Sequence, residues 1–271
     1  MFIRIDCKGA TIRVAPFALW LLLFCLPAHA LAAACPAQAI SERVSVVHVY
    51  DGDTVKLTDG RRLRLIGINT PELRRDQHSV EPFAEEARSA LQAMLDRSNR
   101  TLLLQYGQEQ QDHYGRLLAH AFLDNGDNVG ARLLQAGLAT ALVVPPNTRL
   151  QACYRQQEDL ARSARLGLWA HPRYQVQDSR TLPATTRGFA LVHGTVQRVS
   201  RAGGTLWLQL DGPLSLRIGR QDQVNFPTGF HERMAGQTVE VRGWVRSRSD
   251  GSLQMTLRHP AALQTITTRM P

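Results

Sequence analysis

Two stretches of the chain consist of short segments in which apolar and polar residues alternate, and Asp-Gly dipeptides separate several of these segments. The segments of the first stretch cover 44–49, 54–57, 62–68, 101–105 and 117–123. Those of the second stretch cover 194–199, 205–210, 214–218, 238–245 and 253–257. A period of two residues predicts β-strands with one buried face. Five short strands in each stretch favour two small barrels.

Helical spacing accompanies the first set of strands. Apolar residues recur at this spacing from Phe83 to Leu95, after Pro82, and two further helices are predicted at about 128–137 and 148–167. A polar segment without periodicity, 176–188, reads as a linker. We therefore predict a mainly β chain with some α: a five-stranded barrel with three helices over residues 39–175, and a second small OB-like β-barrel over residues 189–271.

Residues 1–34 have the pattern of a secretory signal peptide. Basic residues come first, an apolar run from Ala15 to Leu26 follows, and small residues occupy positions 28–34. The run is shorter than the roughly 20 residues that a transmembrane helix needs. We expect a periplasmic or secreted protein without stable membrane insertion after cleavage. A retained membrane anchor is the alternative.

Only Cys35 and Cys153 remain once residues 1–34 are removed. An isolated cysteine pair in an oxidising compartment tends to form a disulfide. We therefore predict that this pair ties the N-terminal segment to the third helix. Lipidation of Cys35 is the alternative, although the nearest leucine, Leu31, lies one position too far upstream for a good lipoprotein signal.

The positive charge of the chain is concentrated in its second half. The whole chain has a net charge of +9. Residues 39–175 contain 17 Lys and Arg against 16 Asp and Glu, whereas residues 176–271 contain 12 against 6. This charge indicates an anionic partner, with nucleic acid as the leading candidate. A membrane surface or an acidic polysaccharide would suit the same charge.

Four short motifs in the first stretch carry groups suited to chemistry. They are Asp-Gly-Asp-Thr at 51–54, the segment 64–72 from Arg64 to Thr-Pro-Glu, the segment 112–116 that ends in Tyr-Gly-Arg, and the helix that stops at Gly137. Taken singly, each has an ordinary structural explanation, such as a turn, a surface arginine, a cap or a local ion pair. These explanations give no reason for all four motifs to occur together in this order.

The ordered set resembles the staphylococcal nuclease (thermonuclease) family over roughly residues 42–170. The resemblance implies an OB-type five-stranded barrel with three helices, and calcium-dependent hydrolysis of DNA and RNA. It implies that Arg64 and Arg116 grip the scissile phosphate and that Glu72 orients or deprotonates the attacking water. It also places Tyr114 near the bound nucleotide.

The same resemblance assigns calcium binding to Asp53 and to the main-chain carbonyl of Thr70. Asn69 stands where the best-known family members have a second metal-binding aspartate. Calcium prefers oxygen ligands, and an amide oxygen is acceptable to it. Because one negative charge is lost, we expect weaker calcium binding than in a relative with aspartate here.

A second set of binding residues is predicted in the C-terminal stretch. Arg242, Trp244 and Arg246 alternate along one strand and Trp207 lies on another, so the four would share an outward face. Aromatic residues interleaved with cations hold single strands on OB barrels. The alternative is that this face packs on the first domain.

The leading hypothesis is an exported calcium-dependent nuclease that acts on DNA and RNA, single strands favoured, with the second barrel holding the substrate. The alternative is a catalytically weakened module that serves as a nucleic-acid or polyanion scaffold. Asp53, Arg64, Glu72 and Arg116 are all present, which favours the enzyme.

Overall fold

The computed structural model describes residues 34–73, 80–248 and 250–266. The predicted signal peptide falls almost entirely outside these residues and stays a prediction. Within the described ranges, no helix combines the length and the apolar character that a membrane crossing requires.

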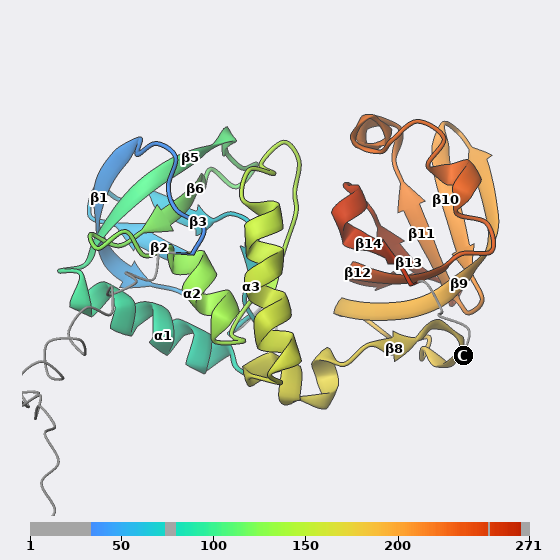
Figure 1. The fold of residues 1–271 in the computed structure, drawn as a ribbon, viewed down its shortest axis with the longest axis horizontal. Coiled ribbons are helices and arrows are strands. Elements are labelled where there is room, and N and C mark those ends of the chain that lie inside the picture. The colour runs from blue at the N-terminus through green and yellow to red at the C-terminus, as the bar shows by residue number, and fades with distance from the viewer. Residues whose placement is uncertain (1–33, 74–79, 249, 267–271) are drawn as a thin grey trace, which may run out of the picture. The chain divides into compact units, whose positions relative to one another are not determined.

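The first barrel closes in the order β1-β2-β3-β6-β5 (Figure 1). Its strands are β1 (Glu42–Val49), β2 (Thr54–Leu57), β3 (Arg62–Leu65), β5 (Thr101–Gln111) and β6 (Leu117–Phe122). β3 and β6 run parallel, and the other neighbours run antiparallel. Most apolar residues of the alternating segments point into the barrel and form one buried core, whereas Val47, beside a register shift in β1, is exposed. The predicted five-stranded barrel is confirmed.

Three α-helices accompany this barrel, as predicted: α1 (Ala84–Arg97), α2 (Val129–Gln135) and α3 (Gln151–Ser163). The side chain of Asn128 caps α2 by accepting a hydrogen bond from the N–H of Ala131 at 2.9 Å. α3 is shorter than predicted, because Arg165 adopts a left-handed conformation that ends the helix before Gly167. A 3-10 helix, η1 (Gly167–Ala170), follows, and then η2 (Pro172–Tyr174).

A short two-stranded pairing fixes the segment that contains Asn69. β4 (Ile68–Asn69) runs antiparallel to β7 (Thr140–Ala141), with Asn69 opposite Thr140. The predicted third strand, 62–68, is thus divided between β3 and β4, with Gly67 at φ 85° between them. A left-handed conformation of this kind favours glycine.

The second barrel has the same strand order as the first. β9 (Gly188–Ala202), β10 (Thr205–Leu210), β11 (Leu214–Ile218), β13 (Leu253–Thr256) and β12 (Thr238–Ser247) follow one another, and β12 pairs with β9 to close the ring. β11 and β13 are the parallel pair. This arrangement is the predicted OB-like barrel. β14 (Leu263–Thr265) adds to β12, and 3-10 helices occupy the connections: η4 (Arg220–Asn225), η5 (His231–Arg233) and η6 (Pro260–Ala262).

The segment predicted to be a linker is built into the second barrel. β8 (Gln177–Asp178) pairs in parallel with β9, and η3 (Ser179–Thr181) follows it. Ser179 is fully buried and donates a hydrogen bond to Asp211, and Leu182 lies in the second core. Polar composition therefore marked an irregular segment here, and not a free spacer.

The predicted disulfide between Cys35 and Cys153 is present. It joins the N-terminal segment to α3 across 118 positions of sequence. Further contacts support the same segment: the N–H of Gln38 donates to Gln105 at 2.8 Å, and Asn128 donates to the carbonyl of Cys35 at 2.9 Å.

Replacement of Cys153 by serine is expected to lower the free energy of unfolding by about 3–5 kcal/mol, because a loop of this length is costly to close without the bond. Denaturant unfolding of Cys153→Ser and of Cys35→Ser measures this loss, and both variants should lose the same amount. Stability equal to that of the oxidised wild type would contradict the assignment.

Candidate active site

The turn between β1 and β2 brings Asp53 against Thr70. Asp53 is only 5% exposed, and its Oδ2 accepts a hydrogen bond from the N–H of Thr70 at 2.9 Å. Gly52 makes this approach possible, since a Cβ at this position would lie 2.7 Å from the Cγ2 of Thr70 and from the Cβ of Ala87. Two of the predicted metal-binding residues are therefore adjacent in space although they lie 17 positions apart in sequence.

Arg64 lies beside the same carboxylate. Its Nη2 is 3.1 Å from Oδ2 of Asp53 and donates to the carbonyl of Ile68 at 3.0 Å. Its side chain is 14% exposed. These contacts hold a predicted phosphate-binding arginine at the predicted metal end of the site.

Arg116 is fixed by the turn that precedes β6. Asp112 accepts hydrogen bonds from the backbone N–H groups of Tyr114 at 3.0 Å and of Arg116 at 2.9 Å, and its Oδ2 pairs with the Nε of Arg116 at 2.7 Å. Burial alone would raise the pKa of Asp112, but the hydrogen bonds and charge of Arg116 hold this pKa below its usual range. Asp112 is therefore an anion that orients Arg116. Tyr114 is 62% exposed, with its ring centroid 5.5 Å from the guanidinium of Arg116.

Arg64 and Arg116 line one pocket. β3 and β6 are parallel neighbours with Leu63 opposite Leu117, so Arg64 on β3 lies near Arg116, which directly precedes β6. The pocket has a volume of about 360 Å³. The structure thus brings together the two arginines predicted to grip a phosphate.

Glu72 follows the buried Pro71 and is half-buried. Its backbone N–H donates to Oε2 of Glu81 at 3.0 Å, and the N–H of Glu81 donates back to the carbonyl of Glu72 at 3.0 Å. This reciprocal pair fixes the backbone at the position of the predicted base. The segment 74–79, with Arg74 and Arg75, lies outside the described residues.

Asp51 is a further residue at this end of the candidate site. It belongs to the Asp-Gly-Asp-Thr motif, but no role was predicted for it from the sequence. Its Oδ1 accepts the N–H of Asp53 at 2.9 Å. Burial raises the pKa of Asp51 to about 7, and the negative charges of Asp53 and Glu72 act in the same direction, while Arg64 opposes them. Its place two residues before Asp53 in the Asp-Gly-Asp turn was the available signal.

The donor set at this end suits a hard cation. The carboxylates of Asp51 and Asp53 and the carbonyl of Thr70 are oxygen donors, and the Asn69 amide adds one without charge. In the part of the chain that the structure describes, no three His, Cys, Asp or Glu side chains are grouped closely enough to hold a metal ion. The oxygen donors named here are of the type that calcium accepts.

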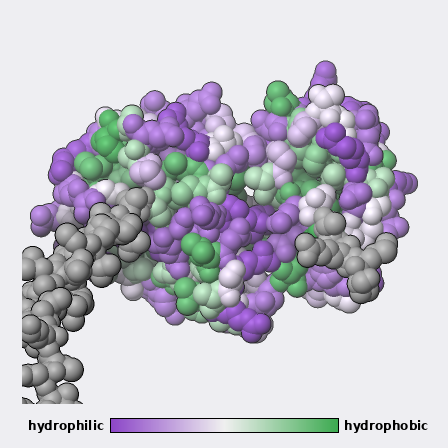
Figure 2. Space-filling view, viewed as in Figure 1, coloured by the Kyte–Doolittle hydropathy of each residue, from purple (hydrophilic) through white to green (hydrophobic). Residues whose placement is uncertain are grey.

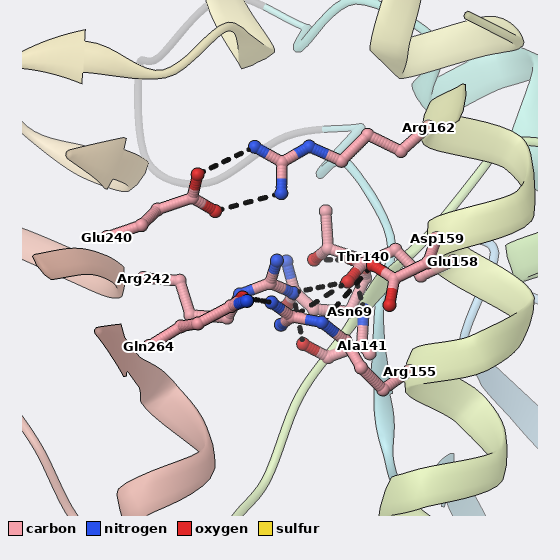
Figure 3. Close-up of polar contacts among 10 residues, drawn as sticks. All are labelled: Asn69, Thr140, Ala141, Arg155, Glu158, Asp159, Arg162, Glu240, Arg242 and Gln264. Carbon is pink, nitrogen blue, oxygen red and sulfur yellow. Dashed lines mark hydrogen bonds and ion pairs between the residues drawn. The ribbon is translucent and has the colours of Figure 1, made fainter. Parts of the chain in front are cut away.

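A series of polar contacts connects the backbone of Asn69 to the second barrel (Figure 3). The hydroxyl of Thr140 donates to the carbonyl of Asn69 at 3.2 Å. The N–H of the next residue, Ala141, donates to Oε1 of the fully buried Glu158 at 2.9 Å. Oε2 of Glu158 lies 2.5 Å from Nη1 of Arg242, which belongs to the second barrel.

The predicted substrate-binding role of Arg242 is therefore wrong. Arg242 is 7% exposed and forms the buried ion pair with Glu158. On the same strand Glu240 pairs through both carboxylate oxygens with Arg162 of α3, at 2.8 and 2.9 Å (Figure 3). The first half of β12 thus packs on α3, as the alternative interpretation proposed for the whole face.

The other predicted binding residues of this face, Trp244, Arg246 and Trp207, are exposed to solvent to different degrees. Trp244 is 40% exposed and contacts Phe189 edge-on, with ring centroids 5.5 Å apart. Arg246 is exposed, and Trp207 is half-buried with the guanidinium of Arg248 5.8 Å from its ring centroid. The outward surface therefore begins at Trp244 and extends away from α3.

Comparisons with known proteins identify the first barrel. The family model described as "Staphylococcal nuclease homologue" matches residues 62–171. A thermonuclease of Staphylococcus intermedius is 35% identical over 132 residues, which cover 47% of this chain and 76% of that protein. The chain is an enzyme of the staphylococcal nuclease family.

Other members show similar likeness. A thermonuclease of Staphylococcus hyicus is 30% identical over 138 residues, covering 50% of this chain and 80% of the relative. The endonuclease YncB of Bacillus subtilis is 32% identical over 150 residues, covering 54% of this chain and 66% of the relative. The family model ends at residue 171, so the second barrel of this staphylococcal nuclease family member lies beyond it.

Replacement of Asp51 by asparagine is expected to stabilise the metal-free protein above neutral pH. The folded pKa of about 7 exceeds the ordinary value of 3.8, so the native state binds the proton more tightly, and stability falls as pH rises from about 4 to 7. At about 1.4 kcal/mol per pH unit the limit is roughly 4 kcal/mol, and water at the site reduces the expected gain to about 2 kcal/mol. Urea unfolding in EDTA at pH 4.5 and 8 measures it. A gain that is equal at both pH values would contradict the assignment.

Replacement of Arg242 by alanine is expected to destabilise the protein by about 3–5 kcal/mol, because it leaves Glu158 buried without its closest cation. Arg246→Ala, on the exposed part of the same strand, is the matched control and should change stability by less than about 0.5 kcal/mol. Denaturant unfolding of both variants and of Arg242→Ala/Glu158→Gln measures the coupling. Simple additivity in the double variant would show that the two side chains do not interact.

Proposed function

We propose that this nuclease is exported, hydrolyses phosphodiester bonds of DNA and RNA, and depends on calcium. The observation that carries the proposal is the shared pocket of Arg64 and Arg116, with Asp53 against Arg64 at 3.1 Å. Cations for a phosphate and oxygen donors for a metal thus adjoin at one end of the first barrel.

The two arginines suit the phosphate of a nucleic acid. A phosphodiester is an anion, and the transition state of its hydrolysis places charge on the equatorial oxygens. Guanidinium groups donate several hydrogen bonds to such oxygens. Asp112 engages the Nε of Arg116, which leaves its terminal amino groups to face the pocket that both arginines line.

Glu72 is the proposed base. Its carboxylate would accept a proton from the water that attacks phosphorus, in line with the leaving oxygen. The hydrogen bonds with Glu81 fix the backbone of Glu72, from which this carboxylate extends. Its negative charge contributes to raising the pKa of Asp51, which supports a role for Glu72 at the same end of the site.

Calcium would be held by Asp53, the carbonyl of Thr70 and the amide of Asn69, with Asp51 as the added carboxylate. When bound, the ion supplies positive charge near the reacting phosphate. Asn69 contributes no negative charge, so we expect calcium to bind less tightly here than in a site with aspartate at this position.

The second barrel supports a single-stranded substrate. Its excess of basic residues, 12 against 6 acidic ones over residues 176–271, gives long-range attraction for polyanions. Trp244, Arg246 and the Trp207–Arg248 pair offer stacking surfaces and cations. Figure 2 shows hydrophilic and hydrophobic areas mixed over the visible side of the molecule.

Export is supported by two features. The disulfide between Cys35 and Cys153 is typical of proteins that fold in an oxidising compartment. The sequence pattern of residues 1–34 is that of a secretory signal. We propose the periplasm or the exterior of the cell as the location.

Digestion of single-stranded DNA and of RNA by the oxidised protein tests the proposal. Cleavage with calcium, none with EDTA, and a loss of at least 10²–10³-fold in kcat for Glu72→Gln are expected, since removal of one positioned group costs about that much. The variant should still bind the oligonucleotide. Binding without cleavage by the wild type would favour a scaffold, and equal cleavage in EDTA would remove calcium from the proposal.

A further inference from the structure

The pocket that contains Arg64 and Arg116 has a third arginine, and this residue comes from the second barrel. Arg258 follows β13 and lines the pocket together with the two arginines of the first barrel. Opposing charges on the lining are those of Glu109 and Asp112, of which Asp112 already pairs with Arg116. The match to the family model ends 87 positions before this residue, at 171 (258 − 171 = 87).

Local contacts hold Arg258 in a position to bind. Its Nε lies 3.3 Å from Oδ1 of the buried Asp222, and its backbone carbonyl accepts a hydrogen bond from Asn225 at 3.0 Å. The neighbouring Leu257 donates its N–H to the carbonyl of Arg217 at 2.8 Å. The side chain of Arg258 is still 47% exposed. The contact of Nε with Asp222 thus orients the guanidinium group and leaves its terminal N–H groups available to a ligand.

The second barrel is itself fixed against the first. From residue 33 onward the chain forms one compact unit. The buried pair Arg242–Glu158 and the two-bond pair Glu240–Arg162 join β12 to α3 (Figure 3). A small apolar cluster of Ala161, Trp169, Phe189 and Leu191 joins β9 to α3 and η1. The barrel that carries Arg258 is therefore held against α3 by ion pairs and apolar contacts.

The chemistry of the pocket suits one nucleotide and the phosphate next to it. Leu142 and Val144 form an apolar part of the lining, which suits a base or sugar. Arginine at a second point suits a second phosphate, since it binds phosphate oxygens through two parallel N–H groups. A volume of about 360 Å³ is of the size of a single nucleotide unit.

We infer that Arg258 is a substrate-binding residue that holds the phosphate adjacent to the scissile one, so that the substrate site of this nuclease is completed by its second barrel. The preferred substrate is therefore a single strand with at least one phosphate beyond the cleaved bond. This inference rests on the proposed nuclease function, because it names a further contact in the same site.

The first test measures binding without cleavage. A short fluorescent single-stranded DNA is titrated with full-length Glu72→Gln protein, with and without Arg258→Ala, and its anisotropy is followed at several salt concentrations. The added change should raise Kd about tenfold and reduce the slope of log K against log salt by about 0.7. Arg258→Lys should lie between the two. Arg233→Ala, an exposed arginine of the same barrel outside the pocket lining, is the matched control.

The second test measures turnover by the otherwise unchanged enzyme. Arg258→Ala should raise KM for the oligonucleotide about tenfold with kcat within about twofold of wild type. Cleavage of bis(p-nitrophenyl) phosphate, a diester without a neighbouring phosphate, should be unaffected. A merely structural role for Arg258 would slow both substrates alike.

The outcomes separate this inference from the proposed function. If Arg258→Ala binds and cleaves as Arg233→Ala does, or slows both substrates equally, the inference is overturned while the nuclease function stands. If wild type fails to cleave but Arg258→Ala still weakens oligonucleotide binding with the stated loss of salt dependence, the nuclease proposal fails and the binding role of Arg258 is upheld.

Discussion

Glu158 is the residue on which the arrangement of this protein depends most. One of its carboxylate oxygens receives the N–H of Ala141, and the other faces Arg242 of the second barrel. Because the side chain is fully buried, neither contact can be replaced by water without a large cost in free energy. Glu158 therefore joins α3, the strand that backs Asn69, and the second barrel into one unit.

The two barrels share a strand order but use it differently. In the first, the parallel pair β3 and β6 adjoins the arginines that line the pocket. In the second, the start of β9 and the first half of β12 contact α3 and η1. Trp244 and Arg246, further along β12, are exposed. The same topology thus supplies a reactive site once and a support with a limited binding surface the second time.

Sequence alone predicted the first barrel and the family, because both depend on local signals. Alternation reveals a strand and its buried face, and the spacing of Asp53, Arg64, Glu72 and Arg116 reveals a family. The same alternation placed Arg242 and Trp244 on one face correctly. It could not predict which part of that face is covered. Glu158 of α3, which is 84 positions away from Arg242 in sequence, pairs with Arg242 and covers the first part. The pKa of Asp51 and the position of Arg258 could not be predicted from the sequence, because both depend on burial and contacts that exist only in the folded chain.

The connection between the two barrels is ordered, and this affects how a nucleic acid strand could contact both barrels. β8 and η3 are part of the second barrel, so no free tether separates the two halves. With a tether, a strand held by one half would reach the other at a concentration averaged over many orientations. Here the contacts between α3 and β12 set one spacing between the two barrels. A strand that touched both barrels at once would have to fit that spacing, so the fold itself would select among the conformations of a flexible ligand.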